Sequence, residues 1–148
     1  MFGLSRKSDY AIVALARLAR GGWPPRRLSA REIAEADDLP LALLSGLLQQ
    51  LQHAELVSAR RGVGGGYCLA VPPDEIRLAE VIRAVEGSEP VRLAACCGPQ
   101  EEDEPGGCRI EARCPITLAI QRLNRRLGGL LEQTTLQELL AAEPASTR

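Results

Sequence analysis

Hydrophobic residues recur at three- and four-residue intervals in the first third of the chain, which is the spacing of amphipathic helices. The first such run covers residues 6–20 and stops at a turn rich in glycine and proline. Ser29 and Glu32 carry the signature of a capping box, which predicts a second helix ending at Ala36. Pro40 suits the first turn of a third helix. The apolar set of that helix is Leu41, Leu44, Leu47, Leu48 and Leu51.

A β-hairpin is predicted directly after these helices. Leu56–Ala59 and Tyr67–Ala70 are short strand-like runs, and the segment between them holds Arg60, Arg61 and four glycines. Taken alone, such a segment is also typical of a plain flexible turn. Two short helices joined by a tight turn, however, are typical of a helix-turn-helix, and a hairpin that follows one predicts a wing. Its paired arginines are then placed to enter a minor groove or to hold phosphates.

Two more helical patterns lie beyond the wing. The first predicts a fourth helix that ends at Gly87, with apolar residues Ile76, Leu78, Val81, Ile82 and Val85. In the second, past Pro115, the apolar residues are spaced as in a coiled-coil seam. The members of that seam are Ile116, Ile120, Leu123, Leu127 and Leu130. The seam predicts either a helix that packs within the monomer or a dimerisation helix. The polar residues outside the seam favour the dimerisation helix.

The expected fold is therefore mainly α with a small β-hairpin wing: a winged helix-turn-helix plus a long dimerisation helix. We expect a DNA-binding domain over residues 1–87, a cysteine segment over residues 88–114, and the dimerisation helix with a C-terminal tail over residues 115–148. Thr135 and Glu138 form a second capping-box pattern, which opens a last short turn before the tail.

Four of the five cysteines lie in the segment between the last two helical patterns. They are Cys96, Cys97, Cys108 and Cys114. The residues between them are acidic or rich in glycine and proline, with almost nothing apolar to bury, so the segment needs an external tether to hold a shape. Thiolates suit iron–sulfur clusters, zinc or copper(I), and ordinary thiols or a disulfide are the alternative. Zinc sites usually carry closely paired cysteines, and the gap from Cys108 to Cys114 is wider.

Composition and charge narrow the function. Residues 1–71 hold nine Arg and Lys against six Asp and Glu, whereas residues 72–148 hold nine against thirteen, so the cationic half is the half with the predicted helix-turn-helix. No secretory-signal pattern or membrane-spanning apolar run is present, so we expect a cytoplasmic protein with no membrane attachment. With a single His and no Ser/His/Asp arrangement or phosphate loop, the sequence does not indicate an enzyme.

Several motifs resemble those of the Rrf-type family of bacterial winged helix-turn-helix regulators, which includes IscR, NsrR and the SUF-system regulators. The resemblance covers the chain from Leu4 to about Leu140. It is carried by residues 4–11, Leu56-Val57, residues 61–67, residues 78–87 and three spaced cysteines. This likeness implies a homodimer that reads a palindromic operator in double-stranded DNA and binds an iron–sulfur cluster through three cysteines of each subunit.

By this resemblance the cluster ligands are Cys96, Cys108 and Cys114, with Cys97 as an alternative to Cys96. Members like IscR place a His three positions beyond the last cysteine, where this chain has Thr117, a poor iron ligand. In members like NsrR a carboxylate at the start of the first helix reaches across the dimer, and Asp9 occupies that position. The resemblance thus favours [4Fe-4S] over [2Fe-2S]; the alternative for Asp9 is stabilisation of its helix through the dipole.

The expected function is an iron–sulfur-cluster-sensing regulator, a repressor of genes for iron–sulfur assembly or for redox or nitric oxide stress. The alternative is a zinc-stabilised or metal-free winged-helix module that binds a protein partner. For DNA contacts we expect two sets of side chains, one on the third helix and one on the wing. They are Ala42, Ser45, Gly46, Gln49, Gln50, Arg60 and Arg61. The remaining cysteine, Cys68, is expected to be a buried hydrophobe, and His53 a surface or packing residue.

Overall fold

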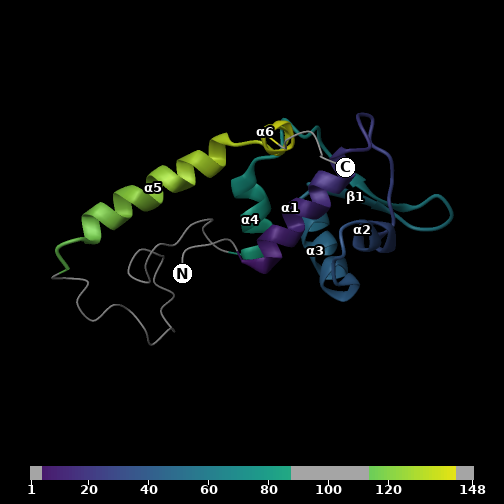
Figure 1. Cartoon of the computed structure of the whole chain (residues 1–148), viewed down its shortest axis with the longest axis horizontal. Helices are drawn as coiled ribbons and strands as arrows, with labels where there is room; N and C mark the ends of the chain where they lie inside the picture. Colours follow the sequence, from purple (N-terminus) through teal and green to yellow (C-terminus); the bar gives the residue numbers. More distant parts are fainter. Residues whose placement is uncertain (1–4, 88–113, 143–148) are drawn as a thin grey trace.

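The computed structural model describes residues 5–87 and 114–142 and shows a mainly helical chain with one antiparallel hairpin, as predicted (Figure 1). The cysteine segment expected over residues 88–114 lies outside the described residues except for Cys114. The elements are α1 (Arg6–Ala19), α2 (Ala30–Ala36), α3 (Leu41–His53), β1 (Val57–Arg60), β2 (Gly66–Leu69), α4 (Leu78–Glu86), α5 (Thr117–Gln133) and α6 (Leu136–Ala141).

The apolar faces of the first helices form one core. Leu15 and Leu18 of α1, Ile33 of α2 and Leu48 of α3 are completely buried in it. The helix starts follow local hydrogen bonding, as the sequence indicates. The Ser5 hydroxyl accepts from the first amides of α1, and at α2 the Ser29 hydroxyl accepts from the Glu32 amide while the Glu32 carboxylate accepts from the Ser29 amide. These caps set where the helices begin, and burial sets how they pack.

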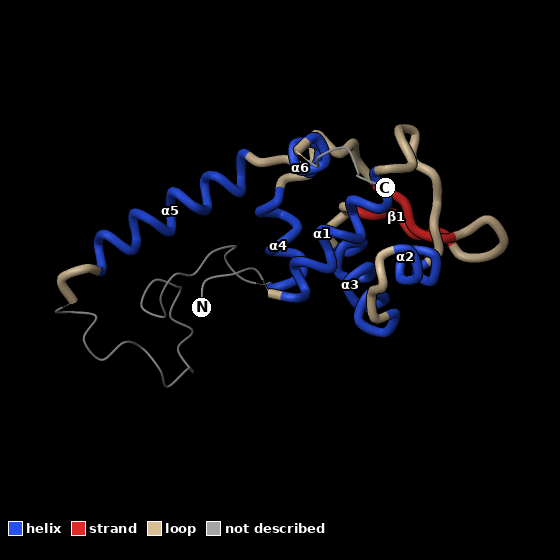
Figure 2. Tube along the Cα trace, in the orientation of Figure 1, coloured by secondary structure: helices blue, strands red, loops and turns tan. Residues whose placement is uncertain are grey.

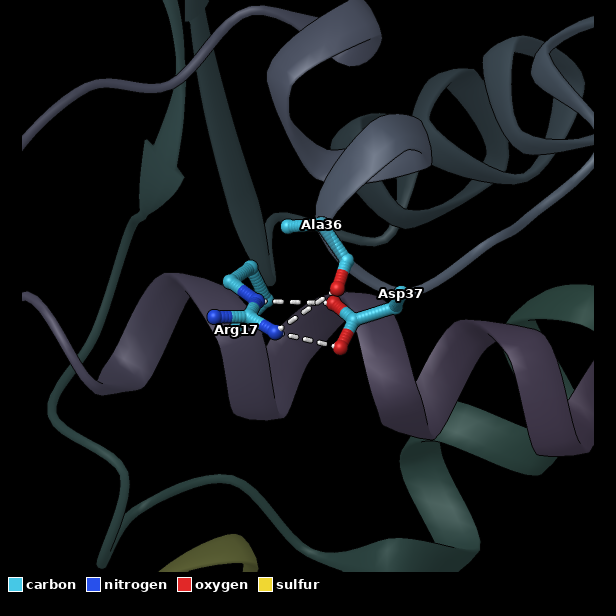
Figure 3. Close-up of polar contacts among 3 residues, drawn as sticks. All are labelled: Arg17, Ala36 and Asp37. Atoms are coloured by element: carbon cyan, nitrogen blue, oxygen red, sulfur yellow. Dashed lines mark hydrogen bonds and ion pairs between the residues drawn. The ribbon is translucent and has the colours of Figure 1, made fainter. Parts of the chain in front are cut away.

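An ion pair fixes α1 to the turn of the helix-turn-helix (Figure 3). Arg17 donates from Nε to Asp37 Oδ2 at 2.7 Å and from Nη2 to Asp37 Oδ1 at 2.5 Å, which is a bidentate arrangement. The same Nη2 also donates to the carbonyl oxygen of Ala36, the last residue of α2, at 3.3 Å. Arg17 therefore satisfies the C-terminal end of α2 and holds the turn that leads into α3.

The hairpin pairs β1 with β2 in the register Val57–Leu69, Ser58–Cys68, Ala59–Tyr67 and Arg60–Gly66. Both strands lie one residue nearer the tip than the sequence predicts. At the base of the hairpin, the Leu56 amide donates to the Leu51 carbonyl oxygen of α3 at 3.0 Å, so Leu56 closes the turn after that helix instead of opening the strand. Cys68 is buried, as expected.

Helix α4 follows the wing and ends at Gly87, which takes the left-handed conformation that favours glycine (φ 69°). Ile76 is fully buried but precedes the helix, since Arg77 is its N-cap. The last helix, α6, returns to the core: Leu136 is fully buried and donates its amide to the Ile76 carbonyl oxygen at 2.9 Å. The predicted last turn is thus a docked helix with a complete capping box at Thr135.

Helix α5 leaves this body and projects from it (Figure 2). Its C-terminal end is attached to α4 through an ion pair between Arg83 and Glu132 and through the Arg77 Nη1 donor, which lies 3.2 Å from the Gln133 carbonyl oxygen. None of its residues is buried. Within the two described stretches, no helix is both long and apolar enough to cross a membrane.

Candidate nucleic-acid interface and cysteine segment

One face of α3 is left free of the core and is polar. Leu44, Leu47, Leu48 and Leu51 point inward, and the opposite face exposes Ala42, Gly46, Gln49 and Gln50. Ser45 is half-buried, and its hydroxyl donates to the Leu41 carbonyl oxygen at 2.8 Å, which leaves its oxygen as an acceptor. The structure thus places the predicted recognition residues on one helix face.

The wing stands beside this face and encloses a cleft with it. Gln49, Gln52 and His53 of α3 line one side of a space of about 480 Å³, and Arg60, Arg61 and Tyr67 are among the residues on the other side. Amide, imidazole and guanidinium groups therefore converge on one hollow, and none of the described residues that line it is acidic. A cleft with this lining suits a polyanion backbone more than an apolar ligand.

Sequence reasoning missed five of the residues that line this cleft: Gln52, His53, Ala59, Gly66 and Tyr67. Gln52 and His53 lie one turn beyond Gln49 on the same helix face, so helical spacing would have found them. His53 is exposed, in keeping with the expectation of a surface residue, but it belongs to the cleft. Tyr67 depends on hairpin geometry, which a linear pattern does not contain.

Of the predicted cluster ligands, the structure describes Cys114 and Asp9. Cys96, its alternative Cys97, and Cys108 lie outside the described residues. Cys114 is half-buried immediately before α5. A hydrogen bond from the Thr117 hydroxyl, and then one from the backbone at Ile116, lower the pKa of the Cys114 thiol from its ordinary value of 9.0. Thr117, the poor iron ligand, thus favours the thiolate of its neighbour.

Asp9 lies exposed in the first turn of α1, on the body of the molecule. At the start of the same helix, the carboxylate of Glu86 accepts hydrogen bonds from the Ser5 hydroxyl and, at 2.8 Å, from the buried Ser8 hydroxyl. Glu86 is the last residue of α4, so the end of that helix is fixed to the start of α1. Cys114 precedes α5, the helix that projects from the body (Figure 1). Among residues 5–87 and 114–142, no three His, Cys, Asp or Glu side chains are grouped as a metal site.

A polar recognition-helix face, a hairpin that carries arginines and a shared cleft define a winged helix-turn-helix DNA-binding protein. Comparison with known proteins is consistent with this class. The model of the family described as "Rrf2: Iron-dependent Transcriptional regulator" matches residues 4–142. The chain belongs to the Rrf2 family, as its sequence motifs predicted, and it is a transcriptional regulator of the helix-turn-helix type, not an enzyme.

Individual relatives agree with the family. The chain is 34% identical over 141 residues to the HTH-type transcriptional regulator IscR of Sodalis glossinidius, covering 95% of this chain and 79% of that protein. It is 35% identical over 138 residues to IscR of Klebsiella pneumoniae (strain 342), covering 93% of this chain and 78% of that protein.

Two solved structures share the fold. CymR, named as the global cysteine regulator of B. subtilis, matches with a TM-score of 0.72 and 29% identity, covering 97% of this chain and 100% of that chain. IscR of T. potens matches with a TM-score of 0.71, covering 99% of this chain and 93% of that chain, and at 24% identity it supports the fold alone.

Proposed function

We propose that this regulator senses an iron–sulfur cluster and acts as a homodimeric repressor on a palindromic operator, in the cytoplasm, where it controls iron–sulfur assembly or redox and nitric oxide stress genes. The observation that carries the proposal is the setting of Cys114: a thiol whose ionised form is favoured, at the start of a helix with an unburied apolar seam. The family description, iron-dependent transcriptional regulator, supports the same metal.

The dimer is supported by the exposed side chains of the α5 seam. Ile116, Leu123 and Leu130 are 57%, 46% and 60% exposed, and a row of large apolar side chains on one helix face is typical of a protein–protein interface. A second copy that covers this row would give two recognition helices related by a two-fold axis, as a palindromic operator requires.

In this proposal the cluster ligands are Cys96 or Cys97, Cys108, Cys114 and Asp9. The donors that the structure describes fit such a group: a thiolate is a soft ligand for iron, and an exposed carboxylate is free of the core. Because Cys114 precedes the projecting helix α5 and Asp9 lies on the body, we infer that Asp9 serves a cluster held by the partner subunit. When bound, the cluster supplies a centre whose oxidation, nitrosylation or loss alters the ligand set.

Metal content tests the proposed cluster and its ligands. Protein purified without oxygen should be brown and contain iron and sulfide, with four irons per cluster if [4Fe-4S] is correct. Cys108→Ala and Cys114→Ala should abolish the visible absorption, and the buried Cys68→Ala is the matched control that should keep it. Asp9→Ala should leave an iron-containing but more labile chromophore. Colourless protein after reconstitution with iron and sulfide would contradict the proposal.

On DNA, we propose that α3 reads bases in the major groove through Ala42, Ser45, Gly46, Gln49 and Gln50 while the wing holds the backbone through Arg60 and Arg61. Gln is suited to adenine, and arginine to phosphates or a narrow minor groove. Arg61→Gln should weaken binding to all duplexes and reduce the dependence of affinity on salt, whereas Gln49→Ala should act only on the correct site. Arg125→Gln, on α5, removes the same charge away from the wing and serves as the control.

A second candidate is a zinc-stabilised or metal-free winged-helix module that binds a protein partner. The likeness to CymR favours the metal-free form, because the name of that protein refers to cysteine and not to iron. Elemental analysis separates the candidates: zinc, or no metal, together with operator binding that does not depend on iron, would favour the module.

A further inference from the structure

Arg27 lies in the connection between α1 and α2, in the cationic half of the chain, but its guanidinium faces the wing. Nη1 donates to the carbonyl oxygens of Ser58 at 3.2 Å and Gly66 at 3.1 Å, and Nη2 lies 3.3 Å from the Ser58 hydroxyl. Ser58 is in β1 and Gly66 is in β2, so one side chain joins both strands of the hairpin. The planar fork of arginine is suited to such a bridge.

The residue after Arg27 extends the same attachment. Leu28 and Tyr67 exchange two backbone hydrogen bonds, of 2.9 and 2.7 Å, which makes the connection a short third edge of the wing. The backbones are so close that a Cβ on Gly66 would lie 2.6 Å from the Leu28 carbonyl oxygen. Ser29, the N-cap of α2, follows directly. The base of the wing is thus attached to the start of the helix-turn-helix.

This contact differs from those expected of the two tip arginines. Arg60 and Arg61 are exposed and line the cleft beside α3, whereas Arg27 is half-buried and is not among the residues that line it. Arg27 holds backbone oxygens whose positions determine where the strands lie. A shift of the hairpin would move Arg61 and Tyr67 relative to His53 and so change the width of the cleft.

We propose that Arg27 is a positioning residue for DNA binding: it sets the wing against α3 and makes no contact with the duplex. The proposal rests on the proposed role of the wing arginines. Its first consequence, however, concerns the protein without DNA, so the two can be tested separately.

The first experiment measures amide hydrogen exchange in the full-length, DNA-free protein. In Arg27→Gln the amides of Leu28 and Tyr67 should exchange about tenfold faster, because the edge that they form opens more often. Arg26→Gln removes the same charge one residue away and should leave these amides unchanged. Equal exchange in the wild type and Arg27→Gln would overturn the proposal, whatever the DNA result.

The second experiment measures duplex affinity by fluorescence anisotropy. Arg27→Gln should bind about tenfold more weakly, which corresponds to losing one charge-assisted hydrogen bond. Arg27→Lys keeps the charge but not the fork, so it should also bind more weakly; it is the milder variant if the Gln substitution impairs folding. Wild-type affinity in Arg27→Lys would indicate simple attraction to phosphates and contradict a positioning role.

A double-mutant cycle completes the test. If Arg27 acts through the wing, Arg27→Gln should cost little in a chain that already carries Arg60→Gln and Arg61→Gln. Additive losses would mean an independent contact with DNA and overturn the proposal. If the Arg60 and Arg61 substitutions themselves leave the affinity for DNA unchanged, the proposed role of the wing is wrong. The hydrogen-exchange experiment then still tests whether Arg27 holds the wing in place.

Discussion

The body of residues 5–87 and the helix α5 differ in how far their apolar side chains are buried. In the body, leucines of α1 and α3 are buried around one core, and the Arg17–Asp37 ion pair fixes the turn before α3. The buried leucines are Leu15, Leu18, Leu44, Leu47, Leu48 and Leu51. In α5 no residue is buried, and three of its five seam residues are exposed outright. The difference indicates that the body carries the chain's own stability, whereas the apolar face of α5 is left uncovered. In our proposal a second copy of the chain covers that face.

The largest effect is expected from charged substitutions on the apolar seam of α5, and it concerns self-association. Leu123→Arg together with Leu130→Arg should leave the helix-turn-helix folded but weaken self-association by about a hundredfold or more, because two unpaired charges would enter an apolar interface. Analytical ultracentrifugation measures this. Gln121→Arg, outside the seam, adds the same side chain and should leave the association unchanged; a chain that stays dimeric with both leucines replaced would place the interface elsewhere.

The same substitution in the two regions should differ in its cost. Leu48→Ala leaves a cavity in the core and should lower the free energy of unfolding by about 2–5 kcal/mol. Leu118→Ala, at a position 71% exposed on α5, should change it by less than about 0.5 kcal/mol. Urea denaturation of both variants checks this, and similar losses would show that Leu118 is covered in solution.

Glycines should also respond differently in the two regions. An added Cβ at Gly128 or Gly129 of α5 meets nothing within 4 Å, so Gly→Ala at either position should stabilise the helix by about 0.5–1 kcal/mol. At Gly66 of the wing, where φ is 122° and the Leu28 backbone is in the way, the same change should destabilise. Thermal unfolding gives the two signs, and destabilisation at Gly128 would indicate a close neighbour there.

A smaller effect concerns the start of α5. Thr117→Val removes the hydroxyl that lowers the pKa of the Cys114 thiol, so that pKa should rise toward 9.0 and less thiolate should form at neutral pH. Alkylation of metal-free protein by iodoacetamide, followed on the tryptic peptide 114–122, should be several-fold slower in the variant. Above the ordinary thiol pKa the two rates should converge, and a difference that persists there would point to altered access instead.

The smallest effect lies in the body. Hydrogen bonds from the Ser29 amide and then the Ser29 hydroxyl lower the pKa of Glu32 below 4.5. The pKa of this carboxyl is lower in the folded than in the unfolded state, so its ionised form stabilises the fold at a pH above the unfolded-state pKa. That contribution should be lost as the pH falls through the folded-state pKa. In Glu32→Gln the melting temperature should therefore decline less on acidification. Ser29→Ala removes the hydroxyl but keeps the amide, so its acid profile should lie between those of the wild type and Glu32→Gln. An unchanged acid profile in Glu32→Gln would remove Glu32 from the explanation.

Much of the body could be predicted because its signals are local. The capping box at Ser29 and the left-handed Gly87 that ends α4 depend on residues a few positions away. The attachment of Arg27 to the wing joins residues 31 and 39 positions apart, and the Ser8–Glu86 contact spans 78, so neither is visible in a linear pattern. The burial of Leu136 against Ile76 is of the same kind.

The candidate site divides in the same way. Exposure of Gln49 and Gln50 follows from helical spacing once the buried leucines are known. That His53 and Tyr67 face each other across one cleft depends on how the hairpin packs against α3. The proposed cluster could be predicted only as a set of ligand types, because its geometry depends on residues 88–113 and on a second copy.

The central claim is that the state of an iron–sulfur centre changes how the dimer binds its operator. The most direct measurement is the affinity of the iron-loaded and the iron-stripped full-length protein for a duplex from its own promoter region, at one fixed salt concentration. The account predicts that the two affinities differ by about fivefold or more, the lower end of ordinary coupling between sites. Equal affinities, with both forms folded and dimeric, would contradict it.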